Sequence, residues 1–277
     1  GTGRIFGWLG IVGVALNAWA AQHFARAVGA RSPWTLLAGV GFGFCGMAAT
    51  GLLEGHIYQV FNPWLPWFGA ALWRASSTDG TTRQAWLALC LFVLCWLTTA
   101  YVGVVALGMA IGLMVMSDKR PRAFSIGGLA FMVAYVLWYI HGDAPAREAL
   151  EGLNPMSAHM AGLLAATPEI DRVEHSMAPV VYGWMLGLVV LGWRVLGPGR
   201  WRALLYAGGG SIVLSMIPGF AASPDLVLIP ANLNWVPSPV AGFLRFPIRW
   251  AWLWSLCGGV LAAVVATRLA PRWGRWG

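Results

Sequence analysis

Long apolar segments, separated by short polar or charged ones, run through almost the whole chain. A membrane-spanning helix needs about 20 mainly apolar residues to cross about 30 Å of hydrocarbon. This pattern predicts nine spans, at residues 5–22, 34–53, 57–73, 84–99, 101–116, 123–140, 179–196, 203–217 and 249–267. We therefore expect an all-α fold, a polytopic membrane bundle that forms a single transmembrane domain over residues 1–277.

Two boundaries in this pattern need an argument beyond hydropathy. Residues 84–116 carry no charge, and as one helix they would be about 50 Å long, too long for one span. We expect this segment to turn near residues 98–101. In the segment 57–73, Pro63 and Pro66 are expected to kink or break the helix, because proline removes a backbone donor. The freed backbone groups must then be buried in protein or line water.

The charges set the expected orientation of the bundle. Only 10% of the residues are charged and 58% are hydrophobic, which excludes a soluble enzyme, a disordered chain and a small disulfide scaffold. The loops on one side hold 13 of the 18 basic residues and two acids, whereas the other side holds five basic residues and eight acids. Because positive loops stay in the cytoplasm, we expect the N-terminus outside and the C-terminus inside. The arginines are scattered between apolar runs, which argues against a nucleic-acid partner.

Two long external loops follow from this topology, at about residues 141–178 and 218–248. Both exceed the usual length of a connection within a compact domain. The first span begins at residue 5 on the outer side, with no signal peptide before it. This arrangement predicts that the chain is a fragment of a longer protein with at least one further helix upstream.

Four residues in the first quarter of the chain could carry chemistry at the outer face. Glu54 and His56 lie where a span emerges, and a carboxylate there could act as a base or hold a cation, while the imidazole could pair with a phosphate. Trp64 and Trp67 flank the proline break and offer flat faces to a sugar or a lipid. The alternative interpretation is that these groups are wetted by headgroup water or anchor the interface.

Arg245 and Arg249 precede the last span on the side where arginine is sparse. Two guanidinium groups at the mouth of a helix can clamp a phosphate or diphosphate, although a pair of snorkelling interfacial arginines would give the same pattern. The cysteines and histidines lack zinc-ligand spacing, and the acidic loop lacks a calcium pattern. We expect no metal or other cofactor, although the chemistry would be compatible with a divalent cation.

The order of four short motifs resembles that of a known membrane family. They are the Arg26-x-x-Gly29-Ala30 turn, Glu54-Gly55-His56, Trp64-Leu65-Pro66, and Arg245-Phe246-Pro247-Ile248-Arg249 before a helix. This series is similar to the YfhO-related multi-pass proteins of bacterial inner membranes, within the C-type (GT-C) glycosyltransferases. The resemblance spans most of the chain, without the N-terminal helix and the first external loop of that family.

This resemblance implies a transfer of sugar from a polyprenyl-phosphate carrier at the outer face of the membrane. Glu54, His56, Arg245 and Arg249 would lie at the rim of the pocket, with Trp64 and Trp67 binding substrate. In that family the base lies in the first external loop, so here it would lie upstream of Gly1 or on another chain, and enzyme activity stays an open question. The alternative is a non-catalytic subunit of a larger membrane complex. A third reading, a transporter with its site at the broken segment 57–73, lacks the inverted repeat of such proteins.

Overall fold

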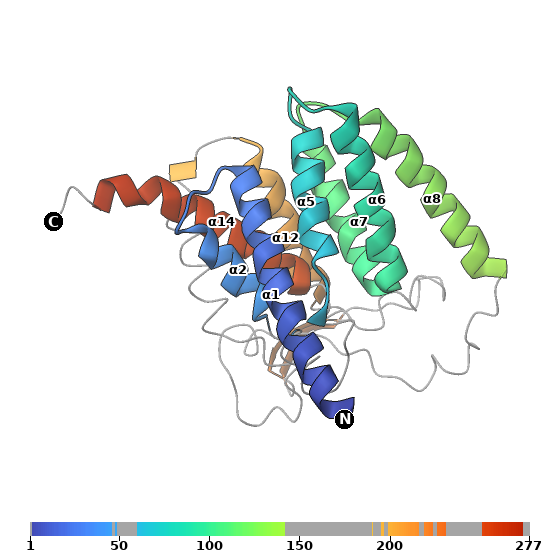
Figure 1. Ribbon diagram of the computed structural model, residues 1–277, viewed down its shortest axis with the longest axis horizontal. Coiled ribbons are helices and arrows are strands. Elements are labelled where there is room, and N and C mark those ends of the chain that lie inside the picture. Colours follow the sequence, from blue (N-terminus) through green and yellow to red (C-terminus); the bar gives the residue numbers. More distant parts are fainter. Residues whose placement is uncertain are drawn as a thin grey trace.

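The computed structural model describes residues 2–45, 48, 60–141, 190, 195–196, 199–215, 219–223, 226–230 and 251–273. Within these residues the chain forms eight helices and one two-stranded hairpin (Figure 1). The elements in chain order are α1 (Thr2–Val28), α2 (Thr35–Gly43), α5 (Trp64–Ala75), α6 (Thr82–Thr98), α7 (Ala100–Val115), α8 (Arg122–His141), α12 (Trp201–Ser215), β1 (Gly219–Ser223), β2 (Leu226–Pro230) and α14 (Ala251–Trp273). The helical class expected from the sequence is confirmed, and the hairpin is an addition that the apolar pattern did not predict.

The turn expected between two apolar segments lies at a single residue, Thr99. It ends α6 and begins α7 with an extended backbone, at φ −160° and ψ 152°. Its side-chain Oγ1 accepts a hydrogen bond from the backbone N–H of Val102 at 3.2 Å, which satisfies one of the donors left free at the start of a helix. The two helices pack side by side as an antiparallel pair, so the split of residues 84–116 is confirmed.

One helix of the described residues is long and apolar enough to cross a membrane, and it is α14, over Trp252–Pro271. Three further helices are apolar but shorter, at Thr82–Thr98, Ala100–Val115 and Arg122–Trp138. At 1.5 Å per residue, a helix of 17 residues such as α6 is about 25 Å long, somewhat short of the hydrocarbon thickness. Nine spans are therefore not established by the described helices.

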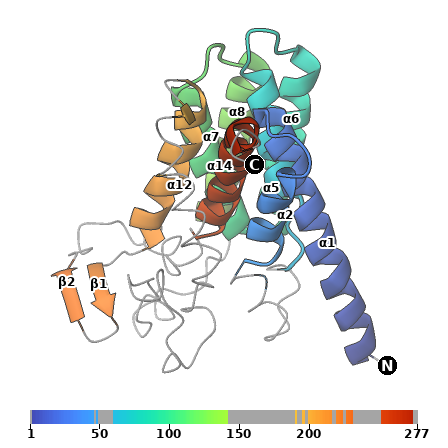
Figure 2. The ribbon, with the colours of Figure 1, turned by 90° about the vertical axis from the view of Figure 1, so that its left-hand side faces the viewer.

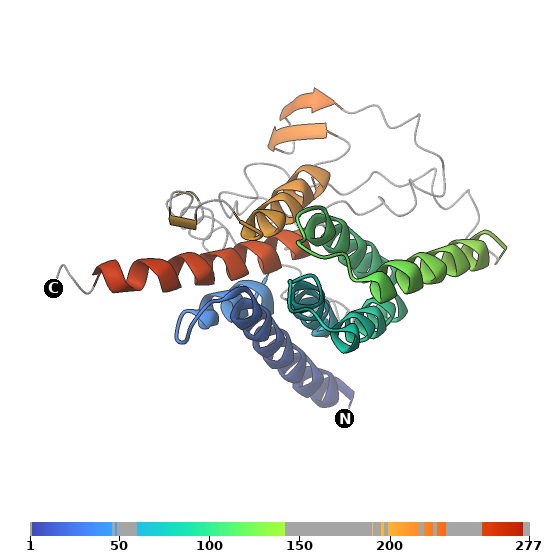
Figure 3. The same ribbon diagram turned by 90° about the horizontal axis from the view of Figure 1, so that it is seen from above.

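The helix α14 is the centre around which half of the bundle packs. It lies between α12 on one side and α1 and α2 on the other (Figure 3). Trp252, Leu253 and Leu256 are almost completely buried. The other half consists of α5, α6, α7 and α8 (Figure 1), and contacts of α1 with α5 and of α7 with α12 join the halves around one continuous core.

Glycines let the helices of the α14 half approach closely. A Cβ atom added at Gly43 would lie 2.8 Å from the Cβ of Ala18 in α1, and one at Gly259 would lie 3.1 Å from the Cα of Ala38 in α2. In the glycine run of α12, a Cβ at Gly208 would lie 3.0 Å from Cys257. Small residues at such crossings are typical of membrane helix packing.

Aromatic rings hold α8 against α6. Trp96 and Tyr135 have ring centroids 4.5 Å apart, Phe92 and Phe124 lie 5.7 Å apart, and Phe92 and Phe131 lie 6.1 Å apart. These separations and tilted geometries are those that aromatic pairs prefer. From this attachment α8 slants away from α7, as Figures 1 and 3 both show.

The hairpin follows α12 directly. Its strands β1 and β2 pair antiparallel, with Gly219 opposite Pro230 and Phe220 opposite Ile229. Figure 2 shows the hairpin beyond the last turn of α12, in the segment that the sequence assigned to the second external loop. The N-terminus of α1 lies at the same end of the bundle (Figure 2).

Candidate functional site

The candidate site residues divide into two groups. Glu54, His56, Arg245 and Arg249 lie outside the residues that the structure describes, so their predicted place at the rim of a pocket stays a prediction. Trp64 and Trp67 are described, and both belong to the first turn of α5. The site is therefore built from this turn and from what packs against it.

The expected break in the segment 57–73 is present, and α5 begins only at Trp64 with Pro63 as its N-cap. Asn17 of α1 fills the place of the lost helical hydrogen bonds. Its Nδ2 donates to the backbone carbonyl of Val60 at 2.7 Å, and its Oδ1 accepts from the backbone N–H of Asn62 at 2.9 Å. Asn17 is 2% exposed, so one buried amide satisfies the donor and the acceptor that the break leaves free. We call residues 60–63 with Asn17 the helix break.

The helix break lies at the N-terminal end of α5, beside the middle of α1. Helix α5 has 12 residues, so its first residue is about 18 Å from its C-terminal end. Gly13 gives α1 its close approach, because a Cβ there would lie 3.0 Å from the carbonyl oxygen of Val60. The break is therefore buried inside the bundle, between α1 and the start of α5.

Three indole rings meet beside the helix break, and we call them the tryptophan cluster. The centroids of Trp19 and Trp67 lie 5.6 Å apart at 89°, and those of Trp64 and Trp67 lie 5.6 Å apart at 58°. Trp19 is 53% exposed, while Trp64 and Trp67 are partly buried against the core. The cluster thus combines the exposed ring of Trp19 with the partly buried rings of Trp64 and Trp67, and such aromatic faces are suited to an apolar chain or to the face of a sugar ring.

A second polar region gathers at the opposite end of α5. Hydrogen bonds join segments that the sequence assigned to one side of the membrane: Arg31 N to Thr267 Oγ1 at 2.9 Å, Lys119 N to Ser76 O at 3.3 Å, and Arg268 Nη1 to Leu196 O at 2.9 Å. We call this end of the bundle, where residues 26–31, 74–83, 117–122, 199–202 and 267–268 meet, the basic end.

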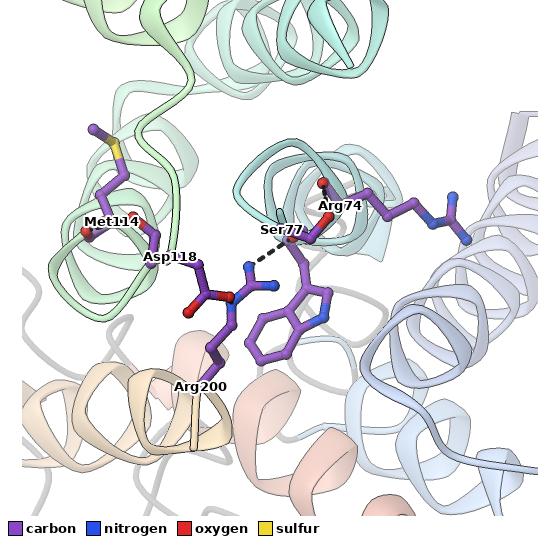
Figure 4. Close-up of polar contacts among 7 residues, drawn as sticks. Arg74, Ser77, Met114, Asp118 and Arg200 are labelled. Carbon is purple, nitrogen blue, oxygen red and sulfur yellow. Dashed lines mark hydrogen bonds and ion pairs between the residues drawn. The ribbon is translucent and has the colours of Figure 1, made fainter. Parts of the chain in front are cut away.

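Arg200 ties three elements together at the basic end (Figure 4). Its Nη2 donates to the carbonyl oxygen of Trp73 at 2.8 Å, and its guanidinium carbon lies 4.5 Å from the centroid of the Trp73 ring. Its Nε lies 3.4 Å from Oδ2 of Asp118. Burial lowers the pKa of Arg200, and the charge of Asp118 acts in the opposite direction. A cation at the carbonyl end of α5 also complements the helix dipole.

His23 contributes a neutral group to the same end. Arg74 Nη1 and His23 Nε2 are 3.0 Å apart, and because arginine only donates, the histidine nitrogen accepts. Burial lowers the pKa of His23, and the positive charges of Arg74 and Arg26 lower it further. The imidazole therefore stays neutral in the fold at a pH where it would already be protonated in the unfolded chain.

The pKa of His23 predicts a pH dependence of stability. Because the unfolded chain binds the proton first, stability is lost as the pH falls through about 6.5, the ordinary histidine pKa. We expect His23→Gln, which keeps an acceptor for Arg74, to reduce the loss of thermal stability between pH 7.5 and pH 5.5. Unfolding of the purified protein in detergent micelles at several pH values measures this. An unchanged pH slope in the variant would contradict the assignment.

Within the part of the chain that the structure describes, no three His, Cys, Asp or Glu side chains lie close enough together to hold a metal ion. The described acids Asp79 and Asp118 both lie in loops of the basic end. The described residues thus form two regions, the tryptophan cluster beside the capped helix break and a group of cations at the other end of α5.

Sequence reasoning missed the two residues that organise these regions, Asn17 and Arg200. An amide in the interior of an apolar span is a usable signal for Asn17, because unpaired polar groups at membrane depth are costly. For Arg200 the neighbouring basic residues hid any signal, since Arg194, Arg200 and Arg202 looked equivalent.

These features were compared with those of known proteins. No protein-family model, no curated protein and no solved structure matches the chain.

Proposed function

We propose that the chain is a multi-pass protein of the bacterial inner membrane that acts as a glycosyltransferase on a polyprenyl-phosphate-linked sugar at the outer face. The observation that carries the proposal is the tryptophan cluster beside the helix break. Trp19, Trp64 and Trp67 offer aromatic faces to an isoprenoid chain or a sugar ring. The reaction itself is proposed from the resemblance of the four motifs to YfhO-related GT-C proteins.

Two observations support the membrane placement and its orientation. Large apolar side chains are exposed along whole helices, including Trp86 at 54%, Leu97 at 73% and Trp138 at 68%, a pattern suited to contact with lipid. The basic end fits the cytoplasmic side by the positive-inside rule. This orientation puts the N-terminus and the hairpin β1–β2 on the outer side.

In the proposed reaction a carboxylate, for which Glu54 is the candidate, takes the proton of the acceptor hydroxyl. The acceptor oxygen then forms a bond to the anomeric carbon of the sugar, and the bond from that carbon to the carrier phosphate breaks with inversion. Arg245 and Arg249 are the proposed partners of the phosphate that leaves. The base that the family places in its first external loop is not among these residues.

The second candidate function is that of a non-catalytic subunit in a larger membrane complex. It is favoured by the place of Asp79 and Asp118, since neither of these described acids adjoins the tryptophan cluster. The exposed apolar faces of α6 and α8 would then pack against partner helices.

The tryptophan cluster can be tested with a polyprenyl phosphate that carries a photoreactive diazirine in its chain. We expect crosslinks in the full chain, reconstituted in nanodiscs, to map to the segment 60–67 and to α1 near Trp19. Replacing Trp64 and Trp67 together with alanine should lower the crosslinked yield about tenfold, from two lost aromatic contacts. Trp86→Ala, which removes an exposed tryptophan of α6, is the matched control.

Crosslinks that map to other segments would count against the carrier site. So would an equal loss of crosslinked yield in the Trp86→Ala control. Trp64→Phe keeps a ring at the same position and should retain most of the yield, which separates binding from a loss of folding. Stable co-purification of other membrane proteins, without carrier crosslinking, would favour the subunit function.

A further inference from the structure

Two cavities at the basic end share one residue, Arg120. The first is an apolar groove of about 580 Å³ between α7 and α8, lined among others by Leu107, Ala110, Met114, Phe124, Gly128 and Met132. The second is a polar cavity of about 610 Å³. Both volumes lie in the range of small-molecule sites.

The apolar groove follows from the way in which α8 is attached. Rings on α6 hold α8 through Phe124 and Phe131, while α8 slants away from α7 (Figures 1 and 3). Phe92 of α6 and side chains of α7 and α8 therefore line a channel that stays unfilled between the two helices. From Phe124 to Met132 the helix advances about 12 Å, a length that suits part of an acyl chain.

The polar cavity has the complementary chemistry of a headgroup site. Lys119, Arg120 and Arg122 line it together with the hydroxyl-bearing Thr81 and Thr82, and its lining contains no acid. Two described acids, Asp79 and Asp118, adjoin lining residues in the chain without lining the cavity themselves, and Asp118 is engaged by Arg200 at 3.4 Å. Lys119 is positioned by a hydrogen bond from its Nζ to the carbonyl oxygen of Gly80 at 2.7 Å.

We infer that this pair of cavities binds one anionic membrane phospholipid, with an acyl chain in the apolar groove and the phosphate beside Lys119, Arg120 and Arg122. An apolar channel alone would accept the chain of any lipid. Three cations at its mouth select for negative charge, because clustered Lys and Arg next to a membrane attract anionic headgroups. This site differs from the tryptophan cluster in residues and in place, so it goes beyond the proposed function and does not depend on it.

The full chain, delipidated in detergent and titrated with phosphatidylglycerol or with phosphatidylcholine, tests the inference by native mass spectrometry. We expect one site at which phosphatidylglycerol binds about tenfold more tightly, from one to two charge-assisted hydrogen bonds. The double variant Arg120→Gln and Arg122→Gln should remove this preference and leave the affinity for phosphatidylcholine unchanged. Arg83→Gln, a charge change at the same end but outside both cavities, should keep it.

The groove has its own test at Gly128. The nearest atom to a Cβ added there is 4.0 Å away, on Phe124, so Gly128→Leu can fill the groove without displacing a neighbour. We expect this variant to bind both lipids about tenfold more weakly, with its thermal stability unchanged. Ala130→Leu adds the same bulk at an exposed position of α8 outside the groove and should bind lipid as the wild type does.

Equal affinities of the wild type for the two lipids would overturn the inference. So would a loss of binding in Arg83→Gln or Ala130→Leu that matches the loss in the groove variants. A protein that co-purifies in fixed ratio and is released by Gly128→Leu, but not by lipid, would show that the groove is a protein interface instead.

Discussion

Replacing Asn17 with leucine is expected to lower the free energy of unfolding by about 2–5 kcal/mol, the largest effect predicted for this protein. The substitution keeps the number and branching of the side-chain heavy atoms but removes both hydrogen bonds. The carbonyl of Val60 and the N–H of Asn62 would then stay buried without their partner. Each such orphaned backbone group costs about 1–3 kcal/mol.

The natural cysteines provide the measurement. Cys45, Cys95 and Cys257 are buried, whereas Cys90 is exposed, so the increase in labelling by a thiol-reactive dye on unfolding reports the three buried thiols. We expect the midpoint of thermal unfolding in detergent to fall by roughly 6–12 °C in Asn17→Leu. Thr98→Val, which removes the hydroxyl that bonds locally to the Leu94 carbonyl, is the control and should stay within about 2 °C. An Asn17→Leu midpoint equal to that of the control would refute the capping role.

The second large effect is expected at Gly103, where a valine should destabilise the fold by about 3 kcal/mol. The indole of Trp96 lies directly on Gly103, and a Cβ there would overlap its ring atoms. Trp96 is 4% exposed and contacts the rings of Phe92, Phe131 and Tyr135. Displacing it would disturb both the α6–α7 pair and the attachment of α8.

Gly209→Ala is the matched control for Gly103→Val, because no atom lies within 4 Å of a Cβ at that helical position. Alanine has the higher helix propensity, so the control should be neutral or stabilising by up to about 1 kcal/mol. The same dye assay reports both variants. If Gly103→Val unfolds at the temperature of the wild type, the packing of Trp96 does not require a glycine at position 103.

Much of the helical framework could be predicted from local pattern. Of the predicted spans, 84–99, 101–116, 123–140 and 203–217 correspond to helices that begin and end within two residues of them. These spans lie in uncharged runs that follow basic residues, and two of the helices meet at the extended residue Thr99. Such boundaries depend on residues that are close together in the sequence. The proline break was equally readable, since Pro63 cannot donate a backbone hydrogen bond.

The prediction failed where the answer depended on a distant residue. The sequence showed that the backbone before α5 would need partners, but not that one amide, Asn17, would supply both. It placed Trp64 and Trp67 beside the proline break, but did not indicate which ring would pack against them. In the structure both belong to the first turn of α5, and Trp67 contacts Trp19 of α1.

The sequence by itself determined the helical class, the bounds of four helices to within two residues and which loops carry the positive charge. It did not determine the end of α2 at Gly43, which falls inside the predicted span 34–53. Only the tertiary structure decided which groups satisfy one another. Asn17 bonds Asn62 across 45 positions, Arg200 bonds Trp73 across 127, and Arg31 bonds Thr267 across 236. The physical reason is that hydropathy and proline act on a residue and its neighbours, whereas a buried hydrogen bond needs two groups that only packing brings within about 3 Å.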